Sequence, residues 1–269
     1  ATDASGNATT SQVTLTVVDN SAPTIATVSG AVTVTLDASG AATIATSDVV
    51  SSTSDNCTSA PTVSITPSAF GCADLGSNTV TITATDASGN VTTATKAVTV
   101  VDNAAPTIVA SNTTISLDAN GVAVLPNATA TATDNCSAAP SIGYSQTTFT
   151  CADLGANTVT ITATDASGNA ATSTIIVTVD DNIAPSITTL STIADVVLNV
   201  NGAAAIGMND VVSSVTDNCG APTVTITPST FGCGDLGTNT VTITATDASG
   251  NATTSQVTLT VVDNSAPTI

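Results

Sequence analysis

The sequence contains no histidine, arginine, glutamate or tryptophan, and its only basic residue is Lys96. Without histidine, no imidazole can serve as a general base, and the usual serine or cysteine nucleophile has no base beside it. A glycine-rich phosphate-binding loop is also absent. We therefore expect that this protein is not an enzyme.

The shortage of basic residues leaves the charge strongly one-sided. All 20 acidic residues are aspartates, and the formal net charge is −19 at pH 7. Such a charge repels nucleic acid and anionic membrane surfaces, and it attracts divalent cations. No apolar run reaches the roughly 18 residues that a membrane-spanning helix needs. We expect no nucleic-acid partner and no membrane insertion by this segment.

Aromatic residues are also scarce, and the chain holds only Phe70, Phe149, Phe231 and Tyr144. Yet 42% of the residues are hydrophobic, mostly Ala, Val and Ile, with Thr between them. Abundant β-branched residues in alternation are typical of strands and not of disordered chains. Ligand-binding surfaces usually carry exposed aromatic anchors, so their scarcity favours a structural role over a binding role.

The clearest feature of the sequence is an internal repeat. Residues 1–25 are identical to residues 245–269, at an offset of 244. Asp-Ala-Ser-Gly-Asn recurs at intervals of 79 to 83 residues, beginning at Asp3, Asp86, Asp165 and Asp247. This period predicts tandem modules. We assign the last part of a preceding repeat to 1–20, complete repeats to 21–103, 104–182 and 183–264, and the start of another to 265–269.

No signal peptide or initiating Met is visible, so we expect a fragment whose export signal and anchor lie elsewhere in its parent.

The hydrophobic pattern inside each repeat has a period of two. In the segment 80–86, Val80, Ile82 and Ala84 alternate with threonines, which predicts a strand with one buried face. The loop Asp86–Asn90 reads as the hairpin between the last two strands, with a glycine that can adopt positive φ. Further strands are predicted at 13–17, 32–37, 41–46, 62–66 and 175–179.

Nothing in the sequence reads as a helix. About seven short strands with regular turn signals predict an all-β fold of tandem immunoglobulin-like β-sandwich repeats. Each repeat has about 80 residues. Strands of about ten residues would make each module roughly 35–40 Å long, and modules in series would form an extended rod.

The repeat motifs resemble a known family. Asp-Asn-Cys at 134–136, the run 78–90 through Asp-Ala-Ser-Gly-Asn and the closing Val-Thr-Val-Val-Asp at 98–102 are similar to hyalin-type (HYR) repeats. This combination of motifs also resembles the giant repeat adhesins of gliding bacteria, of the SprB type. This resemblance implies immunoglobulin-like modules at the bacterial cell surface, cell adhesion, gliding motility and export by type IX secretion.

Six cysteines recur two to a repeat, 14 or 15 residues apart: Cys57 and Cys72, Cys136 and Cys151, Cys219 and Cys233. An even count in an exported chain favours disulfides. We predict pairing within each repeat, with the chain reversing near Thr66–Ser68 and a contribution of roughly 3 kcal/mol for each closed loop of this length. Two alternatives stay open. A zinc site would lack the needed ligands, and intermolecular disulfides would join separate filaments.

Aspartates and asparagines gather where consecutive repeats meet. The hairpin loop of each repeat is expected to reach the linker before it, and the 48–55 loop should lie at the same pole. Oxygen-rich groups on loops suit calcium. The linker Val18–Pro23 also looks like the calcium-binding linker of cadherins. The candidate calcium ligands are Asp19, Asn20, Asp86, Asn90, Asp102, Asn103, Asp165, Asn169, Asp181, Asn182, Asp247 and Asn251.

A plainer interpretation is that these residues only form turns, for which Asp and Asn are suited by local hydrogen bonds. Lys96 replaces an inward apolar residue of the other repeats, so its ammonium group could pair with an Asp at the joint or reach the surface as an edge lysine.

We expect a structural stalk of a large repetitive surface adhesin that extends a binding tip away from the cell. Its partners would be neighbouring identical repeats of the same long chain, with surface glycans bound by another domain. One alternative is a multivalent adhesive array. The other is a self-assembling extracellular filament or sheath, which the strong negative charge opposes unless divalent cations bridge it.

Overall fold

The computed structural model describes residues 1–266 and shows an all-β chain, as predicted. Part of the segment 265–269, the expected start of a further repeat, lies outside the described residues. The chain forms two compact units. Unit 1 comprises Ala1–Thr107 with the loops Thr133–Pro140 and Thr164–Ala170, and unit 2 comprises the rest of the described chain.

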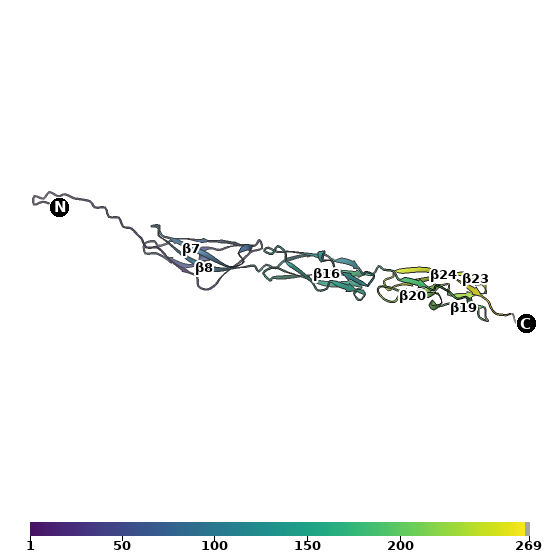
Figure 1. Ribbon diagram of the computed structural model, residues 1–269. Coiled ribbons are helices and arrows are strands. Elements are labelled where there is room, and N and C mark those ends of the chain that lie inside the picture. Colours follow the sequence, from purple (N-terminus) through teal and green to yellow (C-terminus); the bar gives the residue numbers. More distant parts are fainter. Residues whose placement is uncertain (267–269) are drawn as a thin grey trace. The chain divides into compact units, whose positions relative to one another are not determined.

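The first sequence repeat, in unit 1, contains one four-stranded sheet and two short strand pairs. The sheet has the order β2 (Val32–Thr35), β8 (Val91–Val101), β7 (Gly76–Thr85), β5 (Thr62–Thr66). The long strands β7 and β8 form its centre (Figure 1). The edge strand β2 runs parallel to β8. The pairs are β1 (Thr24–Thr27) with β4 (Val50–Ser54) and β3 (Ala41–Thr43) with β6 (Ala69–Gly71).

The same arrangement recurs in the other two repeats. In the second, the sheet is β10 (Thr113–Ser116), β16 (Ala170–Asp180), β15 (Gly155–Thr164), β13 (Ser141–Tyr144), and the pairs are β9 (Thr107–Ala110) with β12 (Ala130–Thr133) and β11 (Val122–Val124) with β14 (Thr148–Thr150). In the third, the sheet is β18 (Val196–Val197), β24 (Ala252–Val262), β23 (Gly237–Thr246), β21 (Thr223–Thr227), and the pairs are β17 (Ser186–Thr189) with β20 (Val212–Thr216) and β19 (Ala203–Ala205) with β22 (Thr230–Gly232).

Each core is built from the alternation that the sequence shows. Val80, Ile82 and Ala84 on β7 are completely buried, while the threonines between them face the other way. One phenylalanine completes each core, and it pairs across its strands with an alanine, as Phe149 does with Ala123. A large ring opposite a small side chain fills the space between short aliphatic residues without a void.

Two local predictions were wrong. Short helical turns occur at α1 (Thr46–Val49), η1 (Cys72–Asp74), η2 (Asn127–Thr129), η3 (Cys151–Asp153), η4 (Met208–Asp210) and η5 (Cys233–Asp235), although no helix was expected. The segment Val13–Val17 is not a strand, and its apolar side chains are exposed. It has no neighbouring strand to supply the ladder hydrogen bonds that a strand needs.

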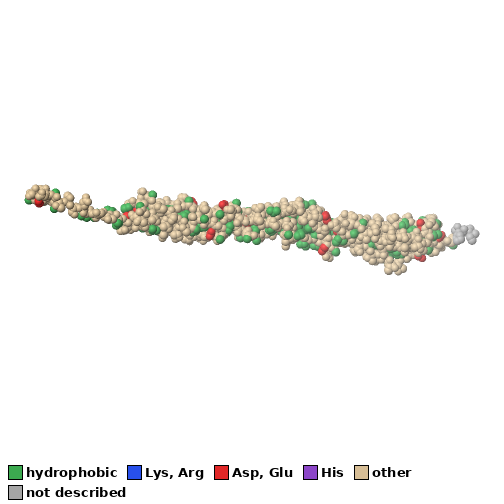
Figure 2. Space-filling model, turned by 90° about the horizontal axis from the view of Figure 1, so that it is seen from above, with side chains coloured by type: hydrophobic (Ala, Val, Ile, Leu, Met, Phe, Trp, Pro, Cys, Tyr) green, Lys and Arg blue, Asp and Glu red, His purple; other side chains and the backbone are tan. Residues whose placement is uncertain are grey.

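Hydrophobic and acidic side chains are a minority on the face that Figure 2 shows. They are scattered among backbone atoms and side chains of other types. No helix in the part of the chain that the structure describes is long and apolar enough to cross a membrane.

Candidate functional site at the joints between repeats

The hairpin loop that joins the last two strands of each repeat holds the linker before that repeat. In the loop after β15, Asp165 accepts the backbone N–H of Asn169 at 2.7 Å, and the amide of Asn169 donates to the same carboxylate at 2.8 Å. The amide of Asn169 also donates to the carbonyl of Asp102, in the linker, at 3.0 Å. Asn90 and Asn251 bond to the linkers in the same way, at 3.1 and 2.9 Å.

The Asp-Asn-Cys segment of each repeat supplies the second part of the joint. Asp134 accepts the backbone N–H groups of Cys136 and Ser137, which closes a tight turn. The amide nitrogen of Asn135 then reaches the preceding repeat, where it donates to the carbonyl of Asp37 at 3.0 Å and to Asp102 at 3.3 Å. In unit 2, Asn218 makes the corresponding bonds to Asp118 and Asp181.

These loops bring three carboxylates together at each joint. Cluster 1 comprises Asp19, Asp55 and Asp86, cluster 2 comprises Asp102, Asp134 and Asp165, and cluster 3 comprises Asp181, Asp217 and Asp247. In each cluster, one carboxylate oxygen from every member lies within 4.8 Å of the others. Clusters 1 and 2 lie within unit 1, and cluster 3 lies within unit 2.

The carboxylates of clusters 2 and 3 are withdrawn from solvent. Asp102 and Asp181 are each only 5% exposed, and Asp165 is 8% exposed. One oxygen of Asp102 and one of Asp181 are buried without a hydrogen-bond partner, as are oxygens of the clustered Asp134 and Asp217. Buried polar oxygens are almost always paired, so this recurrence needs a physical explanation.

The hairpin aspartate of each cluster is held in its charged form. Burial by itself would raise the pKa of Asp165, but hydrogen bonds from Asn169 and from backbone N–H groups outweigh it and keep that pKa below its ordinary value. The pKa of Asp86 and that of Asp247 are lowered by the same balance of causes.

Only some of the predicted calcium ligands lie in the clusters. The linker and hairpin aspartates meet at the clusters, and the hairpin asparagines Asn90, Asn169 and Asn251 bridge hairpin to linker as donors. The linker asparagines Asn20, Asn103 and Asn182 are exposed. Asp48 lies outside the clusters, and it accepts the N–H of Ala45 at the start of α1.

The predicted ligand set did not include Asp55, Asp134, Asp217, Asn135 or Asn218, although the 48–55 loop was expected at this pole. The signal was present, because Asp-Asn-Cys recurs once in each repeat. Recurrence alone does not show that this segment meets the linker, and in the sequence it carries only the resemblance to hyalin-type repeats.

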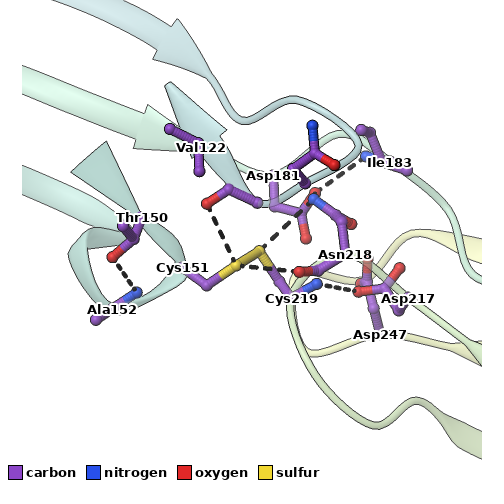
Figure 3. The surroundings of a disulfide bond; sticks show 12 residues. Val122, Thr150, Cys151, Ala152, Asp181, Ile183, Asp217, Asn218, Cys219 and Asp247 are labelled. Atoms are coloured by element: carbon purple, nitrogen blue, oxygen red, sulfur yellow. Dashed lines mark hydrogen bonds between the residues drawn. A yellow bond between two sulfur atoms is a disulfide. The ribbon is translucent and has the colours of Figure 1, made fainter. Parts of the chain in front are cut away.

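Disulfides lie beside two of the clusters and link consecutive repeats. Cys72 is bonded to Cys136 and Cys151 to Cys219, across 64 and 68 residues of sequence. Figure 3 shows the second bridge with Asp181, Asp217 and Asp247 next to it. The prediction of pairing within each repeat was therefore wrong.

The reason lies in the length of β7. Cys72 precedes this strand, whereas the turn of Cys57 lies at its far end, where Thr58 accepts the N–H of Ala87. A strand of 10 residues spans roughly 33 Å. A disulfide requires Cα atoms within about 7 Å, so the two cysteines of one repeat cannot meet.

A glycine in the preceding turn makes room for each bridge. Gly121 has a φ of +71°, and a Cβ atom there would lie 2.7 Å from the Cys151 sulfur and 2.8 Å from the carbonyl oxygen of Asn218. Gly40 is packed in the same way against Cys72 and Asn135. Only glycine combines this backbone conformation with so close an approach.

Cys57 and Cys233 are free and exposed thiols. Cys57 occupies the Asp-Asn-Cys position of Cys136 and Cys219, and Cys233 occupies the position of Cys72 and Cys151. A Cβ at Gly202 would lie 2.6 Å from the Cys233 sulfur. Gly202 and Cys233 are therefore arranged like Gly40 and Cys72, or Gly121 and Cys151, on one side of a formed bridge.

Lys96 takes no part in the clusters. Its ammonium group donates to the carbonyls of Val28 and Gly30 at 2.7 and 2.8 Å. Of the two alternatives for Lys96, the pair with a joint aspartate is not found, and the only lysine of the chain neutralises none of the three clusters.

Comparison with known proteins gives no family. No family model matches the chain. No curated protein matches it either.

Among solved structures, PcdhgB3 EC1-4 is 14% identical over 92% of this chain and 77% of its own, with a TM-score of 0.33. Sidekick-1 immunoglobulin domains 1–5 are 12% identical over 91% of this chain and 60% of their own, with a TM-score of 0.38. Protocadherin Gamma B2 extracellular cadherin domains 1–5 are 15% identical over 93% of this chain and 61% of their own, with a TM-score of 0.35. Likeness at this level carries no conclusion about function.

Proposed function

We propose that this chain is a tension-bearing segment of an extracellular stalk, in which each β-sandwich repeat is covalently locked to the next. The stalk would extend a binding tip of the parent protein away from a cell surface. The observation that carries the proposal is the pairing of Cys72 with Cys136 and of Cys151 with Cys219. Stable disulfides are typical of oxidising, extracellular surroundings.

The disulfides shorten the covalent path through the chain. Force applied along the chain passes across the bridge from Cys72 to Cys136, so the residues between them, which include β7 and β8, carry none of it. The bridge from Cys151 to Cys219 protects β15 and β16 in the same way. Under load, the central hairpins of two sandwiches are therefore shielded from unfolding.

The positions of the two free cysteines predict that the same covalent path continues into neighbouring repeats. We expect Cys57 and Cys233 to bond with the matching cysteines of adjoining copies, because they occupy the same positions as the bonded ones. Every joint would then carry a bridge, and the two bridged cysteines of a repeat would be only 14 or 15 positions apart. Such a segment extends to at most roughly 50 Å, so the array could lengthen little under tension.

Single-molecule force spectroscopy tests this function. The chain is pulled from its two ends, first oxidised and then in the presence of a reductant. The bridges span 64 and 68 residues. Because an extended residue spans at most about 3.6 Å, each bridge hides up to roughly 240 Å of chain. We expect the oxidised chain to unfold with a total extension shorter by two such lengths, and reduction to restore both.

The matched control replaces Cys57 and Cys233, the two free thiols, by serine, which should leave the oxidised extension unchanged. Equal extension before and after reduction would show that the bridges do not lie in the load path, and the stalk proposal would then fail.

The finer features of this proposal rest on the sequence resemblance. They are a place at the bacterial cell surface, a parent adhesin used in gliding, and a tip domain that binds glycans. Against a rival array in which every repeat binds a ligand, the three phenylalanines are all buried and offer no anchor.

A further inference from the structure

We infer that clusters 2 and 3 are binding sites for a divalent cation, and that the ion is calcium. The ligands would be the three clustered carboxylates with the amide oxygen of Asn135 in cluster 2 and of Asn218 in cluster 3. This deepens the proposed stalk function, because each ion would join the linker, the hairpin and the Asp-Asn-Cys turn at a junction of two repeats.

The first argument is the charge. Three aspartates with mutually close oxygens bring together about three negative charges, and the chain has no Arg or His and a single Lys bonded elsewhere. No side chain of the protein can neutralise the clusters. Like charges that converge in this way repel one another, and a positive ion among them offsets that repulsion.

The second argument is the set of oxygens without partners. The amide nitrogen of Asn135 donates to Asp37 and Asp102, and these two bonds fix the orientation of the amide, so its oxygen is left buried without a donor. Oxygens of Asp102 and Asp134 are in the same state. In cluster 3, one oxygen each of Asp181, Asp217 and Asn218 repeats the pattern atom for atom.

The same three oxygens lack a hydrogen-bond partner at two separate junctions. This recurrence indicates that both junctions bind the same kind of ligand. A water molecule would satisfy single acceptors, but acceptors that carry charge and converge on one point favour a cation.

The third argument is the identity of the donors. All of them are hard oxygens, which suit calcium or magnesium, whereas zinc prefers His and thiolate ligands that these clusters lack. Oxygens on opposite sides of a calcium ion lie about 4.6–5.2 Å apart, and the clustered oxygens lie within 4.8 Å of one another. Magnesium demands a smaller and more regular shell, so loops of this kind favour calcium.

Cluster 1 is a weaker version of the same site. Asp19 and Asp55 each have a buried oxygen without a partner, but Asn56 is exposed, and its amide donates to Asp19 and Cys57. Asp19 is also less buried than Asp102 or Asp181. We expect its affinity to be lower than that of the other two clusters.

The experiment is calcium titration of the full oxidised chain by isothermal calorimetry after treatment with a chelator, repeated with magnesium. We expect two calcium ions per chain with dissociation constants of roughly 1 mM or below, as in other extracellular modules. Calcium should also raise the thermal midpoint of unfolding, and magnesium or sodium chloride at equal ionic strength should raise it less.

Asp134→Asn and Asp217→Asn each remove one carboxylate from one cluster. The control is Asp195→Asn, which removes the same charge from an exposed position outside the clusters. Each cluster variant should lose one bound ion and part of the calcium-dependent rise in midpoint, while the control keeps both ions. In chelator, the cluster variants should melt at or above the parent temperature, because they relieve the repulsion.

Fewer than one bound ion per chain at millimolar calcium would overturn the proposal, as would equal losses in Asp195→Asn and Asp134→Asn. Cluster variants that melt early in chelator would show instead that the carboxylates act only through their hydrogen bonds. None of these outcomes touches the stalk function, because its test depends on the disulfides alone.

Discussion

At the scale of single residues, glycine sets how closely two consecutive repeats approach. Gly121 lies in the turn that begins at Asp118, and its Cα faces both the Cys151 sulfur and the backbone of Asn218. The turn chemistry of Asp-x-x-Gly was readable in the sequence. Position 121 also has no space for a side chain, because a loop about 100 residues away packs against it. The sequence around Gly121 does not indicate this contact.

We predict that Gly121→Ala destabilises the second repeat, 104–182, more than Gly168→Ala does. Both positions have positive φ, at +71° and +92°, so both substitutions bear the backbone strain, but only position 121 also meets atoms closer than 3 Å. The strain should cost about 1–3 kcal/mol at either site, and the clash adds to it at position 121 alone. Chemical denaturation of the two oxidised variants measures the difference, and equal losses would contradict the packing argument.

At the scale of elements, the sequence predicted what depends on near neighbours. The alternation at 80–86 gives β7 with its buried Val80 and Ile82, and the predicted strand 62–66 coincides with β5. Asp86–Asn90 is the hairpin loop that was expected. These features follow from side-chain period and turn chemistry, which act over a few residues.

What could not be predicted depends on where elements lie in space. Cys57 and Cys72 are close in sequence, yet β5 carries the chain along the four-stranded sheet, and β6 then pairs with β3 outside that sheet. Cysteine spacing contains no information on this path, because several connectivities are open to any set of six. Asp134 likewise meets Asp102 only through the path of the chain in space. It completes a cluster of which the sequence predicted only Asp102 and Asp165.

We predict that Cys151→Ser with Cys219→Ser lowers the stability of unit 2 markedly. The bridge closes a loop of 68 residues. By the chain-entropy model such a closure contributes up to about 4 kcal/mol. Urea unfolding should show a lower midpoint for the double variant, whereas Cys57→Ser with Cys233→Ser, which removes only free thiols, should leave the midpoint unchanged. A similar loss in both double variants would contradict this assignment.

At the scale of the whole molecule, one 20-residue sequence occurs in two environments. Val257 and Leu259 on β24 are 9% and 4% exposed, while the identical residues Val13 and Leu15 are 85% and 83% exposed. The first segment has the sequence of a last strand but lacks the sheet that would bury it. The difference in burial therefore comes from the neighbours and not from the segment itself.

We predict that the chain shortened to residues 1–244 assembles head to tail. The deletion removes residues 245–269, which are identical to residues 1–25. The 1–20 segment of one copy can then take the place of β24 in the next, which buries Val13, Leu15 and Val17 and brings Cys233 of one copy to Cys57 of the other. Size-exclusion chromatography should show a ladder of oligomers, and denaturing gels should show that the ladder is held by disulfides that a reductant removes.

The full-length chain is the first control, since its own β24 occupies the sheet and should keep it monomeric. In the second control, Val13, Leu15 and Val17 of the shortened chain are replaced by Asn, which removes the apolar face that the exchange would bury. Oligomers that persist in this variant would be held by something other than strand exchange. A shortened chain that stays monomeric would mean that the two identical segments are not interchangeable and that the proposed repeat register is wrong.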